Sequence, residues 1–288
     1  METDAILVKD LTKRYKDFTL DNISFHVPKG SIMGFVGENG AGKTTTIKAI
    51  LDLLQMDGGE AYVLGCPSKK LTMNIKASVG VVFDGSNFHD NLNVNHVNLV
   101  MKNIYNNWDE PMYFNYIKRF DLPNSKIIKE YSRGMKMKLS IAVALSHHSK
   151  LLILDEATSG LDPMVRDEIL DIFLEFIQDE EHTILLSSHI ISDIEKIADY
   201  VTFIHQGKIV FSKSKDELIY QYGVVHCRKE EAEFLDRSFV VGTRENSFGT
   251  DVMIHEKDEF QRKYHQYVVD KTSIEEIMLF ISRGKERR

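Results

Sequence analysis

A glycine-rich stretch near the amino terminus has the residue types that bind phosphate. The run GENGAGKT, residues 37–44, satisfies the pattern G-x-x-x-x-G-K-[ST]. Its glycines allow successive backbone N–H groups to point at phosphate oxygens, at a helix N-terminus whose dipole also favours anions. We expect Lys43 to reach the β and γ phosphates and the hydroxyl of Thr44 to bind Mg²⁺. The predicted nucleotide-binding residues of this loop are Asn39, Gly40, Ala41, Gly42, Lys43, Thr44 and Thr45.

Two consecutive carboxylates in LLILDE, residues 151–156, could complete a hydrolytic site. Asp155 ends an apolar run, where it could hold Mg²⁺ through water. Glu156 is placed to orient and deprotonate an attacking water, so Glu156 and Lys43 are the predicted catalytic pair here. The alternatives are a strand-end cap for Asp155 and a solvated carboxylate for Glu156, which the intact phosphate loop disfavours.

Buried strands and helices must alternate to position these groups. The phosphate loop lies between the apolar run SIMGFVG and the helical pattern TTTIKAILDLL, which is the context that it requires. The alternation predicts a mainly parallel sheet with helices on its faces. The strand-like runs are AILVKDL, SIMGFVG, VGVVF, LLILD, HTILLSS and YVTFI.

Two parts of the chain depart from this alternation. Residues from about 87 to 149 carry helical signals and few strand signals, which predicts a helical insertion. Residues 223–288 have short strand-like runs followed by two helical patterns, which predicts a small accessory unit after an ATP-binding region at 1–222. That accessory unit could serve dimerisation, regulation or packing alone.

Composition excludes several classes of function. The chain has 288 residues, 43% of them hydrophobic, and a net charge of −7, so a surface for nucleic acid is not expected. It has no run of about 18 apolar residues and no apolar signal-peptide core at METDAILVKDLTKRY. We therefore expect a soluble chain that depends on another protein for any membrane function.

The motifs GENGAGKTT, YSRGM, LLILDEATSGLDP and LLSSH follow one another in an informative order. In this order the sequence resembles the nucleotide-binding subunit of ABC transporters, to about residue 220. The resemblance implies an α/β P-loop ATPase fold with a mainly parallel central sheet, an N-terminal antiparallel β region, a helical subdomain and a small α+β C-terminal unit. It also implies ATP and Mg²⁺ as cofactors and hydrolysis of ATP between two ATPase subunits.

The resemblance assigns roles to residues outside the phosphate loop. Ser132 and Gly134 of YSRGM match the turn that closes over ATP held by the partner subunit. Asp162 matches the loop that crosses to that subunit, and it could also cap the helix that begins at Pro163. His189 matches the switch histidine that contacts the γ phosphate and is predicted to be catalytic. Tyr15 matches an aromatic residue that stacks on adenine, with a core position as the alternative.

Two departures from the family pattern affect the site. Arg133 stands where the family's Leu-Ser-Gly-Gly-Gln has its first glycine, so it could add positive charge near the partner's nucleotide or remain solvated. Asp84 in FDGSNF stands where the family has a glutamine that binds Mg²⁺. It could bind the metal as a third carboxylate beside Asp155 and Glu156, or it could only cap a turn.

Several segments resemble a narrower group of bacterial export subunits: FDGSNF, WDE at 108–110, YSRGMKMKL and IEEIMLFISRG. This group includes lantibiotic-immunity-type and phenol-soluble modulin exporter subunits. It implies a peripheral subunit at the cytoplasmic face of the cell membrane, which drives a separate permease through residues 86–98. The expected apolar anchors of that contact are Phe88, Leu92 and Val94. The alternatives are an ATP-dependent resistance or sensing switch and a soluble ABC-type ATPase without a permease.

Overall fold

The computed structural model describes residues 4–85 and 87–284. The chain divides into two compact units, and the division lies between Ser212 and Lys213. The sequence predicted a boundary between residues 222 and 223. Helix α8 (Lys215–Gln221) precedes that position and packs with helices α10 and α11 of the second unit, so the second unit begins earlier.

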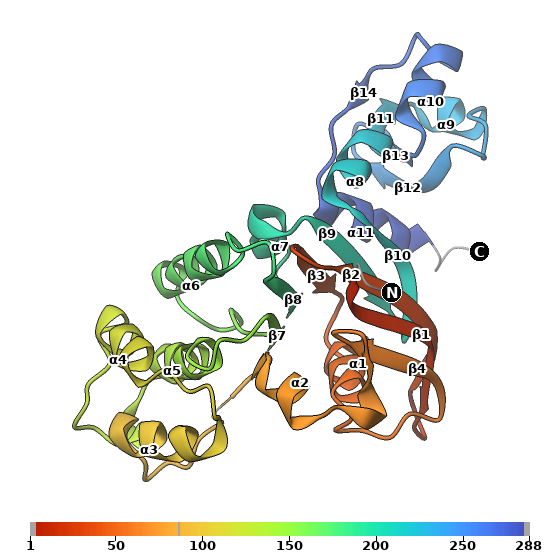
Figure 1. The fold of residues 1–288 in the computed structure, drawn as a ribbon. Helices are drawn as coiled ribbons and strands as arrows, with labels where there is room; N and C mark the ends of the chain where they lie inside the picture. Colours follow the sequence, from red (N-terminus) through yellow and green to blue (C-terminus); the bar gives the residue numbers. More distant parts are fainter. Residues whose placement is uncertain (1–3, 86, 285–288) are drawn as a thin grey trace. The chain divides into compact units, whose positions relative to one another are not determined.

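A six-stranded sheet forms the centre of the first unit (Figure 1). Its strands, in spatial order, are β10 (Lys208–Ser214), β9 (Tyr200–His205), β3 (Ile32–Val36), β8 (Thr183–Ser188), β7 (Leu151–Asp155) and β6 (Val79–Val82). Pairing is parallel from β9 through β6, which confirms the mainly parallel sheet. Strands β3, β7 and β8 are buried along their whole length, as expected for strands covered on both faces.

An antiparallel sheet is formed by the N-terminal part of the first unit, as predicted. Its order is β2 (Thr19–Pro28), β1 (Asp4–Arg14), β4 (Gly58–Val63) and β5 (Cys66–Pro67). Helix α1 (Lys43–Ile50) shares one hydrophobic core with this sheet and with the central strands. Ile6, Phe25 and Ile47 contribute to that core, so both sheets hold the start of α1 in place.

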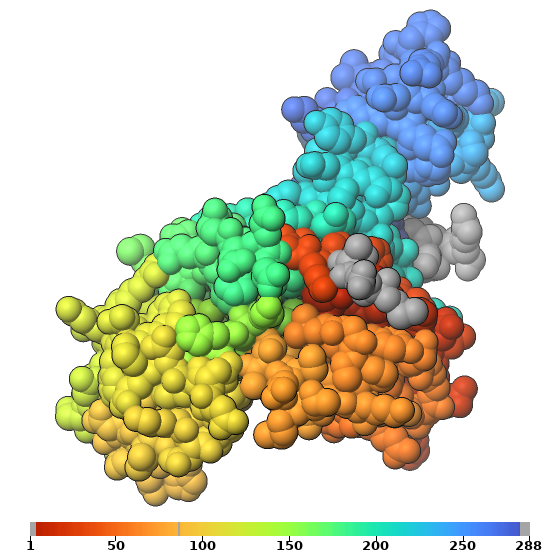
Figure 2. Space-filling model, viewed as in Figure 1, coloured from red at the N-terminus to blue at the C-terminus, as the bar shows by residue number. Residues whose placement is uncertain are grey.

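The predicted helical insertion lies between β6 and β7. Its helices are α3 (Val94–Ile104), α4 (Glu110–Arg119) and α5 (Arg133–Leu145). Figure 2 shows residues of this segment (yellow) as a lobe distinct from the one that the orange residues form. Trp108 Nε1 donates to Asn98 Oδ1 at 2.8 Å, and Asn98 Nδ2 donates to Glu110 Oε1 at 2.6 Å. The WDE segment therefore connects α3 to the start of α4.

Helices α2 (Met73–Ala77), α6 (Pro163–Phe176) and α7 (Ile191–Ile197) complete the first unit. Asp162 caps α6 by accepting a hydrogen bond from the backbone N–H of Val165, and Pro163 occupies the first turn. None of the described helices combines the length and the apolar character needed to cross a bilayer.

The C-terminal unit contains a separate antiparallel sheet and its own core. Its strand order is β12 (Val240–Asn246), β13 (Gly249–Ile254), β11 (Gly223–Cys227) and β14 (Val269–Asp270). Helices α9 (Lys229–Glu233), α10 (Lys257–Lys263) and α11 (Ile274–Gly284) accompany the sheet. Val225, Val252 and Phe260 are fully buried in its core, which confirms a small α+β unit.

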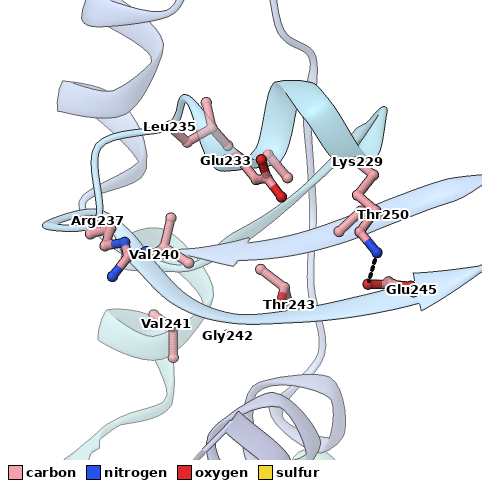
Figure 3. A pocket seen from close by; sticks show the side chains of 11 residues that line it. Lys229, Glu233, Leu235, Arg237, Val240, Val241, Gly242, Thr243, Glu245 and Thr250 are labelled. Atoms are coloured by element: carbon pink, nitrogen blue, oxygen red, sulfur yellow. Dashed lines mark ion pairs between the residues drawn. The ribbon is translucent and has the colours of Figure 1, made fainter. Parts of the chain in front are cut away.

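A hollow of about 640 Å³ lies in this unit beside α9 and β12 (Figure 3). Leu235 and Val240 give it apolar walls, and Lys229 forms an ion pair with Glu245, with 3.0 Å between Nζ and Oε1. No predicted nucleotide-binding residue lies in this unit. The candidate active site therefore belongs to the first unit.

Candidate active site

The phosphate loop connects the end of β3 to the start of α1. Gly42 is the N-cap residue of α1 and has φ +113°, a left-handed conformation that favours glycine. A Cβ atom there would also lie 2.4 Å from Leu20 Cδ2. The Lys43 side chain is 6% exposed, and its Nζ atom donates to the carbonyl oxygens of Gly37 and Glu38 at 2.7 and 3.2 Å. The loop thus holds a cation beside the helix N-terminus.

A cavity of about 770 Å³ opens at this loop and brings together most of the predicted site residues. The residues that line it are Tyr15, Asp17, Phe18, Glu38, Asn39, Gly40, Gly42, Lys43, Thr44, Thr45, Asp84, Asp155 and Glu156. Ala41 lines an adjoining hollow of about 330 Å³. Strands β3, β6 and β7 all end at this cavity because the carboxyl ends of parallel strands share one edge of a sheet.

A hydroxyl group and a carboxylate meet where Mg²⁺ is expected. Thr44 Oγ1 donates to Asp155 Oδ2 at 2.7 Å, and Ser187 Oγ donates to Asp155 Oδ1 at 2.6 Å. Oxygen ligands of this kind suit Mg²⁺, which also retains water and phosphate ligands. Among the described residues no group of three or more His, Cys, Asp or Glu side chains is arranged to hold a metal ion. The Thr44 hydroxyl and the Asp155 carboxylate therefore fit an Mg²⁺ ion that also binds phosphate.

Glu156 lies between a lysine and a histidine. Its Oε1 atom is 3.1 Å from Lys43 Nζ, and its Oε2 atom is 2.6 Å from His189 Nδ1. Oε1 is buried and has no hydrogen bond of good geometry, despite the nearby lysine. The backbone of Glu156 is left-handed, with φ +55°, a conformation that is uncommon outside glycine and concentrates at functional sites. A buried carboxylate oxygen beside the cavity, with a lysine as its charged neighbour, is suited to accept a proton from water once the lysine binds phosphate.

Ser187, at the carboxyl end of β8, was not predicted as a site residue. Its hydroxyl donates to Asp155, and it also accepts from the backbone N–H of Glu156 at 3.2 Å. It therefore orients the Asp155 carboxylate and holds the backbone of Glu156. The signal was present in TILLSS, where two hydroxyl residues end a buried strand, but only the pairing of β8 beside β7 places them at Asp155.

Ser132, Gly134 and Asp162 are not among the described residues that line the cavity. Ser132 Oγ accepts from the backbone N–H of Met135 at 3.2 Å and caps α5, which begins in the predicted turn. Ser132 and Asp162 therefore both cap helices, and the cap at Asp162 is the one that the sequence suggested. Ser132 and Asp162 thus lie at the N-termini of α5 and α6, away from the cavity of their own chain.

Tyr15 lines the cavity and is 46% exposed, so the alternative of a core position is wrong. Its ring lies 6.5 Å from that of Phe18, measured between centroids, and Phe18 also lines the cavity. The exposed ring of Tyr15, beside the partly buried ring of Phe18, offers a surface on which a base could stack.

Asp84 lines the cavity as well, but its carboxylate also has a partner outside it. Its Oδ1 atom accepts from Nη2 of Arg133 at 2.7 Å, and both side chains are about half exposed. The arginine is therefore ion-paired rather than merely solvated.

Comparisons with known proteins agree with this geometry. Residues 20–159 match the ABC transporter family model. The chain is 34% identical over 237 residues to the bacitracin transport ATP-binding protein BcrA of Bacillus licheniformis, covering 80% of this chain and 74% of that protein. It is 32% identical to the lantibiotic transport ATP-binding protein SrtF of Streptococcus pyogenes, covering 73% of this chain and 90% of that protein.

A solved structure agrees in fold. The protein cbiO1 of Clostridium perfringens, part of the ABC transporter complex cbiONQ, superposes with a TM-score of 0.62 at 25% identity. The match covers 74% of this chain and 89% of that chain. This chain therefore belongs to the ABC transporter family, as an ATP-binding subunit that is an ATPase.

Proposed function

We propose that the chain hydrolyses ATP with Lys43, Glu156 and His189 as its catalytic residues and with Mg²⁺ held at Thr44 and Asp155. The observation that carries this proposal is the convergence of Lys43, Thr44, Asp155 and Glu156 on one cavity at the end of the central sheet. Mg²⁺ at this position would neutralise charge on the transferred phosphate.

The lysine and the glutamate change partners during this reaction. Lys43 Nζ lies 3.1 Å from Glu156 Oε1. Phosphate oxygens in the loop compete for the lysine, because charge-assisted hydrogen bonds to an anion at a helix N-terminus are strong. Glu156 can then accept the proton of an attacking water, while His189 holds its other oxygen.

A second ATPase subunit completes the site in this proposal. Ser132, Gly134 and Asp162 serve as the residues that reach the partner's nucleotide, which fits their position away from the cavity of their own chain. The N-terminus of α5 adds a favourable dipole towards a phosphate of the partner site. The partner is a second copy of this chain or a related chain.

A separate permease is the membrane partner, and the transported molecule is an amphipathic or antimicrobial peptide, as in phenol-soluble modulin export. Two relatives support this substrate class: BcrA is named a bacitracin transport protein and SrtF a lantibiotic transport protein. The subunit would then be peripheral, at the cytoplasmic face of the cell membrane.

The permease contact is proposed at residues 87–98, and Ser86 lies outside the described residues. A hollow of about 520 Å³ lined by Phe88, His89, Asp90, Asn91 and Lys129 lies in this segment and could receive a permease helix. Phe88 and Leu92 are partly exposed and remain candidate anchors. Val94 is fully buried at the start of α3, so the prediction that it is an anchor is wrong.

The decisive experiment is a mild-detergent purification of tagged Glu156→Gln protein from its native membranes with MgATP, followed by mass spectrometry. Untagged cells and a sample with MgADP serve as controls. We expect a multi-span protein without a phosphate loop to co-purify in the MgATP sample. Recovery of the bait alone, or of ribosomes, would refute the transporter function and favour an ATPase without a permease.

A further inference from the structure

Arg133 connects the turn at the start of α5 to the loop that follows β6. It occupies the first position of α5, between Ser132 and Gly134, and its guanidinium donates to Asp84 at 2.7 Å. Asp84 lines the phosphate cavity, whereas Arg133 is not among the described residues that line it. The ion pair between Arg133 and Asp84 therefore connects the cavity of this subunit to the Ser132–Gly134 turn, which is proposed to contact the nucleotide of the other subunit.

The same guanidinium also lies against the loop between Glu156 and Asp162. A Cβ atom on Gly160 would lie 2.6 Å from Nη1 and 2.9 Å from Cζ of Arg133. Gly160 has φ +66°, a conformation that favours glycine. The absence of a side chain at Gly160 thus leaves the space that the arginine occupies.

Charge compensation differs among three of the carboxylates that line the cavity, Asp84, Asp155 and Glu156. Asp155 accepts from Thr44 and Ser187, and Glu156 lies beside Lys43 and His189. Within the described part of the chain, Arg133 is the cation paired with Asp84. A carboxylate that accepts from a guanidinium has less negative charge to offer a metal ion, so Arg133 and Mg²⁺ compete for Asp84.

We propose that Arg133 is a positioning residue that holds the Asp84 carboxylate at the rim of the cavity until Mg²⁺ and ATP occupy it. Mg²⁺ binding then weakens the ion pair and releases the Ser132–Gly134 turn towards the second subunit. The occupancy of one nucleotide site is thereby communicated to the turn that completes the other. This inference rests on the proposed function, since it requires Mg²⁺ in the cavity and a second subunit.

A double-mutant cycle on Mg²⁺-dependent nucleotide binding tests the inference. The purified full-length chain is titrated with Mg²⁺ in the presence of a fluorescent ATP analogue, at a concentration where it is monomeric. Because half-exposed ion pairs are weak, we expect R133Q to lower the half-saturating Mg²⁺ concentration by only about two- to fivefold. D84N raises that concentration, and D84N/R133Q matches D84N alone, because the arginine acts through the aspartate.

Two further variants separate positioning from a general loss of charge. Lys136 lies on the same helix and pairs with Asp90 at 3.7 Å, so K136Q removes a positive charge without touching Asp84. We expect K136Q to leave the Mg²⁺ dependence unchanged and R133K to preserve most of the wild-type value. An R133Q effect that equals that of K136Q, or that persists in the D84N background, would overturn the inference.

Hydrogen exchange of the turn provides a readout independent of affinity. Met135 donates its backbone N–H to Ser132 Oγ, and Lys136 donates its own to Ser132 O, so both amides report on the turn. We expect Mg²⁺ added to ATP-bound protein to speed exchange there in wild type but not in D84N. Equal exchange in both proteins overturns the inference alone, whereas failure of the wild type to bind ATP overturns the proposed function too.

Discussion

Lys43 and Glu156 form an ion pair across the phosphate cavity, with 3.1 Å between Nζ and Oε1. Both side chains are largely buried, at 6% and 14% exposure. The residue proposed to bind phosphate and the residue proposed to activate water are therefore ion-pair partners. Phosphate bound in the loop competes with Glu156 for Lys43. Substituting one of the two residues therefore distinguishes an effect on ATP binding from an effect on the rate of hydrolysis.

Glu156→Gln should slow turnover by orders of magnitude while preserving ATP binding. The substitution removes the general base, a contribution of about 10²- to 10⁴-fold in rate, but leaves Lys43 and the loop amides in place. Phosphate release measures the rate, and equilibrium binding of a fluorescent ATP analogue measures affinity. Glu60→Gln makes the same chemical change at an exposed carboxylate of β4 and should have no effect. Near-normal turnover would remove Glu156 from the role of base.

Gly160→Ala should reproduce the effect of R133Q on Mg²⁺ dependence. Gly65 is the matched control, because it has φ +78° and open space around its missing Cβ, whereas a Cβ at Gly160 collides with Arg133. Each alanine should cost about 1–2 kcal/mol of unfolding free energy from the left-handed backbone. Displacing a flexible, half-exposed arginine adds less than about 1 kcal/mol.

Denaturant unfolding and Mg²⁺ titration of both variants measure these two effects. We expect similar stability losses, with only Gly160→Ala lowering the half-saturating Mg²⁺ concentration. If Gly65→Ala lowers the half-saturating Mg²⁺ concentration as much as Gly160→Ala does, the contact between Gly160 and Arg133 does not affect Mg²⁺ binding.

His147 should make the first unit less stable in mild acid. Burial lowers the pKa of this imidazole below its usual 6.5, and its ring stacks on Tyr105 with 4.1 Å between centroids. The neutral form is favoured in the folded state, so its stability contribution is complete above pH 6.5 and is lost as pH falls through the folded pKa.

The free energy of unfolding, measured between about pH 7 and pH 5, checks this prediction. His147→Gln should flatten the decline, because glutamine does not titrate in that range. His148→Gln changes the exposed neighbour, which pairs with Asp109, and should retain most of the decline. An unchanged slope in His147→Gln would assign the acid sensitivity to other groups.

Phe88→Ala and Leu92→Ala should uncouple the ATPase from its permease. Both residues belong to the proposed contact, where a truncated apolar anchor typically weakens binding by about tenfold or more. ATP binding by the isolated subunit should not change, while co-purification of the permease and transport should fall. Met73→Ala is the control, because Met73 is 72% exposed on α2, outside the proposed contact. Full transport by both variants would place the contact elsewhere.

Local pattern was sufficient to predict the elements and the phosphate site. A glycine-rich run between an apolar strand and a helix encodes its own geometry, because residues 37–44 are contiguous and their backbone amides form the binding surface. Buried strands such as β7 and β8 were predicted as continuous apolar runs, since a parallel sheet covered on both faces requires them. The cap at Asp162 was also predictable, because a cap involves only neighbouring residues.

Contacts between distant segments were decided by tertiary structure. Ser187 reaches Asp155 only because β8 pairs with β7, and Arg133 reaches Asp84 only because the start of α5 lies beside the loop after β6. The burial of Val94 likewise depends on how α3 packs. The sequence by itself determined the fold class and the family, and it predicted which groups bind and hydrolyse ATP. Tertiary structure decided which of them are partners, because an ion pair depends on distance in space and not on separation along the chain.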